Sequence, residues 1–98
     1  MNINKVKDGD ELTISLEGRL DTTTAPELDA EVKNSVDGVK SLVFDFEKLD
    51  YISSAGLRVI LSAQKIMNKQ GSMVVKNVSE DINEVLTITG FSDILTIE

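Results

Sequence analysis

Hydrophobic and polar residues alternate along the first part of the chain. Within residues 11–17, leucine and isoleucine take every second position and the residues between them are polar. This period of two predicts a strand with one buried face. Residues 3–7 precede it across a turn-like Asp-Gly-Asp, so we expect the two runs to pair as an antiparallel hairpin. Short apolar, β-rich runs predict three more strands, at residues 41–46, 73–75 and 94–97.

Three other stretches carry apolar residues at the three- and four-residue spacing of a helix. In the first, Thr24 and Glu27 have the spacing of a capping box, and the Asp-Gly pair at residues 37–38 marks the end. The third covers residues 79–90, from a serine N-cap to a terminal glycine. The second helix lies between these two and contains the most informative residues of the chain.

That second helix begins at two adjacent serines. Residues 48–52 link it to the preceding strand, Ser53 and Ser54 take the N-cap position, and residues 70–71 end it. A hydroxyl there lies beside unpaired backbone N–H groups and the positive end of the helix dipole, which accommodate a phosphate. Arg58, four residues after Ser54, is a candidate to steady that phosphate, although an exposed helix arginine is the simpler interpretation. Helix capping alone also accounts for both serines, so a phosphorylation switch and a plain cap are both open interpretations.

The order of the elements indicates the fold class. Strands and helices follow one another as strand, strand, helix, strand, helix, strand, helix, strand. Such alternation predicts an α/β fold with one mixed, mostly parallel sheet, right-handed crossovers and an N-terminal antiparallel hairpin. No repeat, linker or low-complexity tract interrupts the chain, so we expect residues 1–98 to form a single domain.

Composition restricts the chemistry. The chain has 17 acidic and 10 basic residues, a formal net charge of −7, and neither histidine nor cysteine. A negative field repels phosphate backbones, so we expect no nucleic-acid partner. The missing residue types exclude Ser-His-Asp and Cys-His nucleophiles and Cys/His zinc sites. Carboxylate catalysis and metal sites with oxygen ligands remain compatible with this composition, but we expect a protein that is not an enzyme, with no cofactor and no bound metal.

The same composition bears on location. No run approaches the roughly 20 apolar residues of a membrane span, and the first residues lack the apolar core of a signal peptide. The absence of cysteine fits a reducing compartment. We expect no direct membrane insertion and a cytoplasmic location.

Acidic residues follow several of the predicted strands. Because the carboxyl ends of parallel strands share one edge of a sheet, Asp21, Asp45 and Asp50 are expected to lie near the serine pair. Two carboxylates beside a hydroxyl suggest a magnesium-dependent hydrolase or a nucleotide-binding protein as one alternative. No glycine-rich phosphate loop supports that alternative, and aspartates are common in turns.

Three segments resemble a known family. GRLDTTTAPEL at residues 18–28, LVFDFEKLDYISSAGLRVIL at residues 42–61 and GSMVVKNVSEDINEVLTITGF at residues 71–91 are similar to the STAS domain of bacterial anti-sigma factor antagonists. The resemblance covers nearly the whole chain, in the same order and spacing. It implies the STAS form of the α/β fold, with three to four helices.

The resemblance also implies a phosphorylation site. In that family the switch serine lies two residues before the glycine of the motif, which is Gly56 here, so the switch serine is Ser54. Many family members carry an aspartate where this chain has Ser53, which makes Ser53 a second candidate acceptor. We expect Ser54 at the centre of a partner surface with exposed apolar groups. The expected contact residues are Asp21, Thr22, Asp45, Ile52, Ser53, Ser54, Gly56, Leu57 and Arg58.

The implied function is partner switching. The unphosphorylated chain would bind an anti-sigma factor that is also a serine protein kinase, phosphorylation of Ser54 would release it, and a metal-dependent serine phosphatase would reset the chain. An alternative from another class is a non-catalytic STAS adaptor subunit of a membrane ABC transporter complex.

Overall fold

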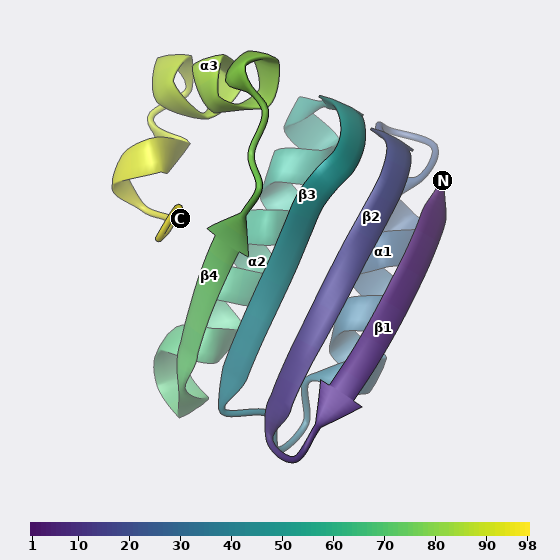
Figure 1. The fold of residues 1–98 in the computed structure, drawn as a ribbon, viewed down its shortest axis with the longest axis vertical. Helices are drawn as coiled ribbons and strands as arrows, with labels where there is room; N and C mark the ends of the chain where they lie inside the picture. The colour runs from purple at the N-terminus through teal and green to yellow at the C-terminus, as the bar shows by residue number, and fades with distance from the viewer.

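Four strands form one mixed sheet in the order β1–β2–β3–β4 (Figure 1). The computed structural model describes residues 1–98. The strands are β1 (Asn2–Asp8), β2 (Glu11–Leu20), β3 (Ser41–Ile52) and β4 (Ser72–Lys76). β1 pairs antiparallel with β2, and β3 pairs parallel with both β2 and β4. The predicted mixed sheet with an N-terminal hairpin is confirmed.

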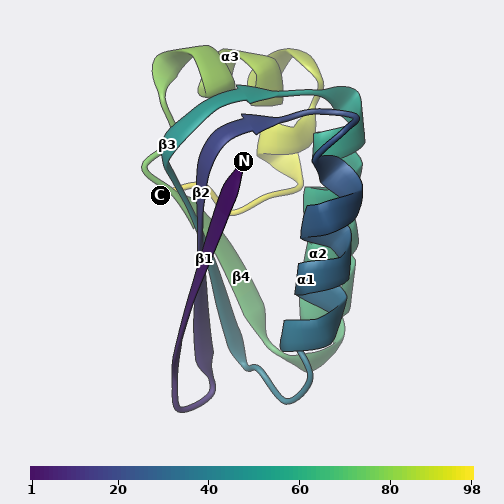
Figure 2. The same ribbon diagram turned by 90° about the vertical axis from the view of Figure 1, so that its right-hand side faces the viewer.

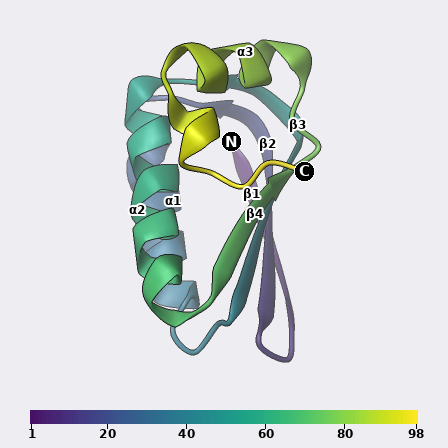
Figure 3. The same ribbon diagram turned by 90° about the vertical axis from the view of Figure 1, so that its left-hand side faces the viewer.

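Three helices complete the fold: α1 (Ala25–Ser35), α2 (Ser54–Gln70) and α3 (Glu80–Ile88), followed by the short 3₁₀ turn η1 (Phe91–Asp93). α1 and α2 lie side by side on one face of the sheet (Figures 2 and 3). Successive right-handed crossovers in the same direction place both helices on that face. α3 lies beyond the carboxyl end of β3. None of these helices has the length and apolar character needed to cross a membrane.

The core fills the space between the sheet and this helix pair. The alternation along β2 turns Leu12, Ile14 and Leu16 toward the helices, and each is at most 2% exposed. Leu28 of α1 and Ile60 of α2 meet them from the other side and are fully buried. The period of two in the strand and the helical spacing thus both point into one apolar layer.

β3 continues to Ile52, beyond the predicted residues 41–46, and two bulges interrupt its pattern there. One extra residue lies between the partners of Ser15 and Glu17, and another between the partners of Gly18 and Arg19. Bulges bend a strand and increase its twist. The ends of β2 and β3 accordingly curl over toward α2 (Figure 2). Residues 48–52, expected to be a link, are therefore strand, and they deliver the chain directly to the start of α2.

The bulges also change which side chains point inward. Phe46, Leu49 and Ile52 are all buried, and they are spaced three residues apart instead of two. Each extra residue shifts the inward position by one, so the alternation that identifies a strand is lost in this part of β3.

The prediction of a strand at residues 94–97 is wrong. Here the chain makes only an isolated bridge between Val75 of β4 and Ile97. The amide of Val75 donates to the carbonyl of Thr96 at 2.9 Å, and the amide of Glu98 donates to the carbonyl of Val75 at 2.8 Å. The turn η1 occupies residues 91–93, directly before this bridge, and the contact with the edge of β4 stays limited to these two hydrogen bonds.

Candidate functional site

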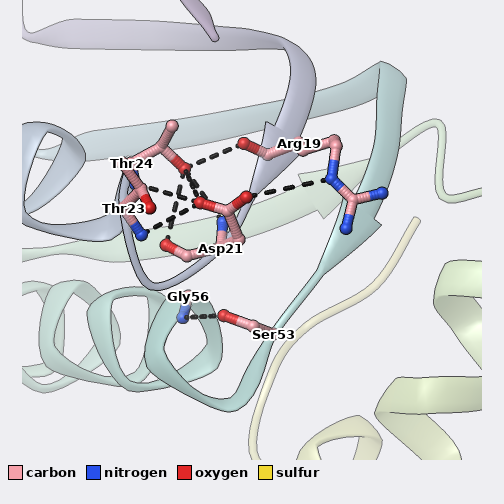
Figure 4. Close-up of polar contacts among 6 residues, drawn as sticks. All are labelled: Arg19, Asp21, Thr23, Thr24, Ser53 and Gly56. Carbon is pink, nitrogen blue, oxygen red and sulfur yellow. Dashed lines mark hydrogen bonds and ion pairs between the residues drawn. The ribbon is translucent and has the colours of Figure 1, made fainter.

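The junction between β3 and α2 gives the two serines different roles. Ser53 is the N-cap of α2: its backbone is extended, and its Oγ accepts from the amide of Gly56 at 3.2 Å (Figure 4). Its own amide donates to the carbonyl of Leu20 at 2.9 Å. Ser53 is half-buried, and both its hydroxyl and its amide are engaged in the fold.

Ser54 is the first residue of α2 and is exposed. Its hydroxyl makes no hydrogen bond within the protein, and the first turn of the 17-residue helix contains no acidic residue. The hydroxyl therefore lies in solvent at the positive end of the longest helix, with no like charge on its own turn to oppose an anion.

Gly56 is required by a close approach. A Cβ on this residue would lie 2.6 Å from Cγ of Leu20 and 3.1 Å from Cγ1 of Ile52, which is too close for the fully packed core. The first turn of α2 therefore rests directly on the end of β2. The glycine of the serine motif brings the serine pair against the loop that follows β2.

That loop is organised by Asp21. Its Oδ1 accepts from the amides of Thr23 at 3.0 Å and Thr24 at 3.1 Å, in the manner of an Asx turn (Figure 4). The hydrogen bond from the Thr24 amide is the main cause that holds the pKa of Asp21 below its ordinary value, and the guanidinium of Arg19 acts in the same direction. Asp21 is thus a charged structural group of the turn.

The capping box predicted from Thr24 and Glu27 is wrong. Thr24 does occupy the N-cap position of α1, but its side chain makes no capping bond. Its Oγ1 instead accepts from the amide of Asp21 at 2.9 Å and donates to the carbonyl of Arg19 at 2.8 Å (Figure 4). The turn before the helix competes successfully for the hydroxyl.

Arg19 and Tyr51 form the outer part of this end of the molecule, and the sequence analysis did not single them out. They are register partners across β2 and β3, and the guanidinium carbon of Arg19 lies 4.2 Å from the centre of the Tyr51 ring. Nε of Arg19 is 3.8 Å from Oδ2 of Asp21. Because the bulges set this pairing, no sequence spacing indicates it.

The expected contact residues divide into exposed and buried ones. Thr22 and Arg58 are exposed and Asp21 is half-exposed, as a contact surface requires. Ile52 and Leu57 are only 4% and 3% exposed, so the expectation that they form exposed apolar groups is wrong. Ile52 closes the inward face of β3, and Leu57 belongs to the stripe of α2 that faces the sheet. Gly56 is buried as well.

Comparisons with known proteins agree with this geometry. The chain matches the STAS domain family over residues 2–98. It is 33% identical over 104 residues to the anti-sigma-B factor antagonist of Listeria monocytogenes, covering 100% of this chain and 90% of that protein. It is 39% identical over 88 residues to BtrV of Bordetella bronchiseptica, described as a candidate anti-sigma factor antagonist, covering 88% of this chain and 76% of that protein.

The chain belongs to the STAS family of anti-sigma factor antagonists.

Solved structures of an antagonist share the fold. SpoIIAA, from Bacillus, matches with a TM-score of 0.79 in its unphosphorylated form and 0.78 in its phosphorylated form. Each match has 18% identity and covers 99% of this chain, and 87% and 91% of the respective SpoIIAA chains. The fold of the present chain therefore resembles both forms of SpoIIAA equally well.

Asp45 lies apart from the serine pair in this antagonist. It precedes the first bulge of β3, and its Oδ1 accepts from Nδ2 of Asn77 and from the amide of Glu47, both at 3.0 Å. Burial opposes its ionisation, but these two bonds and the charge of Lys76 together hold the pKa of Asp45 below its ordinary value. Asp45 joins β3 to the loop before α3, and no hydrogen bond connects it to Ser53 or Ser54.

A groove lies beside the serine pair. It has a volume of about 440 Å³ and runs between the first turns of α1 and α2. Thr22 and Arg58, both expected in the contact surface, line it. The exposed part of the site therefore comprises Ser54, the groove and the turn that holds Asp21.

Proposed function

We propose that this chain is a partner-switching antagonist that binds an anti-sigma factor with serine kinase activity and is released when Ser54 is phosphorylated. It acts as binder and substrate and performs no catalysis itself. A metal-dependent serine phosphatase in the cytoplasm returns it to the binding form. The similarity to the anti-sigma-B factor antagonist of Listeria monocytogenes favours this function over an adaptor subunit of a transporter.

The observation that carries the proposal is the contrast between the two serines. The hydroxyl of Ser54 is exposed and unbonded, so a kinase can reach it without opening the fold. The hydroxyl of Ser53 is half-buried and caps α2 through the amide of Gly56. Phosphorylation at Ser53 would break that cap, whereas phosphorylation at Ser54 leaves every hydrogen bond of the junction in place.

The folded chain should tolerate the modification. A phosphate adds about −1.5 to −2 charges at pH 7. At the start of α2, the helix dipole and the unpaired amides of the first turn favour that charge. The nearly equal similarity of this fold to the phosphorylated and unphosphorylated forms of SpoIIAA supports a switch that does not rearrange the backbone.

The effect of the phosphate would fall on the interface. Changing a complex from mostly bound to mostly free takes about 10⁴ in affinity, or about 5.5 kcal/mol. A dianion that the partner must desolvate without pairing it supplies an effect of that size, whereas a phosphate at the solvent-exposed rim does not. Ser54 therefore has to lie inside the docked surface.

The test uses a serine kinase purified from the source cell by its ability to phosphorylate this chain with Mg-ATP. We expect mass spectrometry to locate one phosphate, on Ser54. Ser54→Ala should abolish the modification, and the matched variant Ser53→Ala should keep it. Phosphate on Ser53 or on a threonine in the unmutated chain would refute the assignment.

A further inference from the structure

The groove between α1 and α2 has an apolar floor next to Ser54. Ala25 and Pro26 of α1 line one side of it, and Ala55 and Val59 of α2 line the other. The two helices lie side by side on the same face of the sheet (Figures 1 and 2). Ala55 directly follows Ser54, so the groove begins next to this serine.

The two charged residues of the groove differ in their pairing. Asp29 of α1 is already neutralised, because Nζ of Lys33 lies 2.9 Å from its Oδ2. Arg58 of α2 is exposed and forms no ion pair. The chain has only one other arginine, Arg19, which is occupied by Asp21 and Tyr51. On a protein of net charge −7, the groove thus offers one free guanidinium beside an apolar surface.

We propose that this groove binds an apolar side chain of the kinase partner and that Arg58 binds a carboxylate of the partner next to it. Phosphate on Ser54 then draws Arg58 away from that carboxylate. The inference rests on the proposed function and specifies which kinds of partner side chain the site binds. Charge complementarity identifies the occupant: a free guanidinium, which binds carboxylates in a bidentate fork, borders an apolar surface.

Helix geometry connects Arg58 to the switch. Residues four apart lie on the same face of a helix, and side chains lean toward the N-terminus. Arg58 therefore extends from its own turn toward Ser54. A phosphate on Ser54 would compete for the guanidinium and would repel the partner's carboxylate at the same point. One modification would thereby remove a contact and add a repulsion.

A double-mutant cycle with the purified kinase tests this role. We expect Arg58→Gln and Ser54→Asp each to weaken binding by about tenfold, as for residues at the centre of an interface. Because the two changes act on one contact, the double variant should bind at least about threefold more tightly than the product of the single effects predicts. Lys65→Gln, two turns further along the same face of α2, should leave the affinity unchanged.

Each outcome of the cycle has a distinct meaning. Independent, multiplicative effects of Arg58→Gln and Ser54→Asp would overturn the shared contact while leaving the phosphorylation switch intact. An unchanged affinity of Arg58→Gln would overturn the role of Arg58. If Ser54→Asp alone had no effect on affinity, the proposed function itself would be in error.

A second measurement needs no partner. Chains carrying phosphoserine at position 54, made with arginine or glutamine at position 58, are titrated by ³¹P NMR. The other charged groups at this end include Arg19, Asp21, Glu27, Asp29, Lys33 and Asp50, and they are the same in both chains. We expect the phosphate pKa to be lower with Arg58 present, by about half a unit, and Arg58→Lys to retain part of the difference. Identical titrations would overturn the contact between phosphate and guanidinium.

The groove itself is tested by filling it. Ala55→Leu adds three carbon atoms to its floor, and we expect the kinase affinity to fall by about tenfold. Ala30→Leu makes the same change at an exposed position of α1 outside the groove and should have no effect. Circular dichroism and thermal unfolding confirm that both variants are folded. Unchanged binding of a folded Ala55→Leu chain would show that the partner does not enter the groove.

Discussion

The side chain of Leu20 occupies the space that a side chain on Gly56 would need. Leu20 is fully buried at the end of β2, and its carbonyl also accepts a hydrogen bond from the amide of Ser53. The next residue is Asp21, which organises the turn into α1. The start of α2 and the turn after β2 are therefore held together as one unit, and the switch serine has a fixed position relative to both.

The first prediction concerns this close approach. Gly56→Ala places a methyl group 2.6 Å from Cγ of Leu20, so Leu20 or the first turn of α2 has to move. We expect a loss of about 1–3 kcal/mol in the free energy of unfolding, measured by urea denaturation. Ser54→Ala, on the same turn but exposed, is the matched control. Stability equal to that of the unmutated chain would show that the approach is less tight than described.

The second prediction separates the two serines by stability. Ser53→Ala removes the only side-chain cap of α2 and should cost about 1 kcal/mol in the free energy of unfolding. Ser54→Ala removes an exposed hydroxyl without a partner and should change stability by less than about 0.5 kcal/mol. The opposite order in urea denaturation would mean that Ser54 is the cap, and would favour Ser53 as the phosphoacceptor.

Most of the fold could be predicted from the sequence. The alternation in β2 and the helical spacing in α2 each have one buried face, so the period alone identifies them. β3 shows where this fails. After Phe46 its inward residues are three apart, because two bulges insert extra residues, and this pattern does not distinguish a strand from a loop. Bulges are set by pairing with β2, which no local pattern reveals.

The candidate site, like the fold, could be predicted from the sequence only in part. The serine pair, Gly56 and Asp21 could be located from local chemistry and motif spacing. The burial of Ile52 and Leu57 could not, because it depends on how the curled end of β3 packs against α2. The capping box expected at Thr24 does not form, because the Thr24 hydroxyl bonds to the preceding turn and not to the helix that follows it. The groove depends on the packing of α1 against α2, which local sequence does not indicate.

The third prediction concerns pH. The turn amides, chiefly that of Thr24, hold the pKa of Asp21 below its ordinary value in the folded chain. The unfolded chain therefore takes up the proton first as pH falls. The stability that Asp21 provides is fully present at neutral pH and is lost as pH decreases through about 4 and below.

We expect Asp21→Asn, which keeps the acceptor oxygen but not the charge, to reduce the loss of stability between about pH 5 and pH 3. Urea midpoints at a series of pH values measure it. Asp50→Asn is the control, because the side chain of Asp50 is exposed and makes no hydrogen bond. A pH profile of Asp21→Asn that matches the unmutated chain would argue against the charged turn.

The fourth prediction concerns Asp45, which the structure places away from Ser54. Asp45→Ala removes the bonds to Asn77 and to the Glu47 amide, so stability should fall by about 1 kcal/mol. We expect the rate of Ser54 phosphorylation and the affinity for the kinase to be unchanged. Reduced affinity in a folded Asp45→Ala chain would extend the partner surface to β3.

The most direct test of the switch compares the affinity of the purified kinase for the unmodified chain and for the chain carrying phosphoserine at position 54, by isothermal titration calorimetry. We expect the phosphorylated chain to bind about 10⁴-fold more weakly while its circular dichroism spectrum is unchanged. Equal affinities, or weaker binding that results from an unfolded phosphorylated chain, would contradict a switch located at the start of α2.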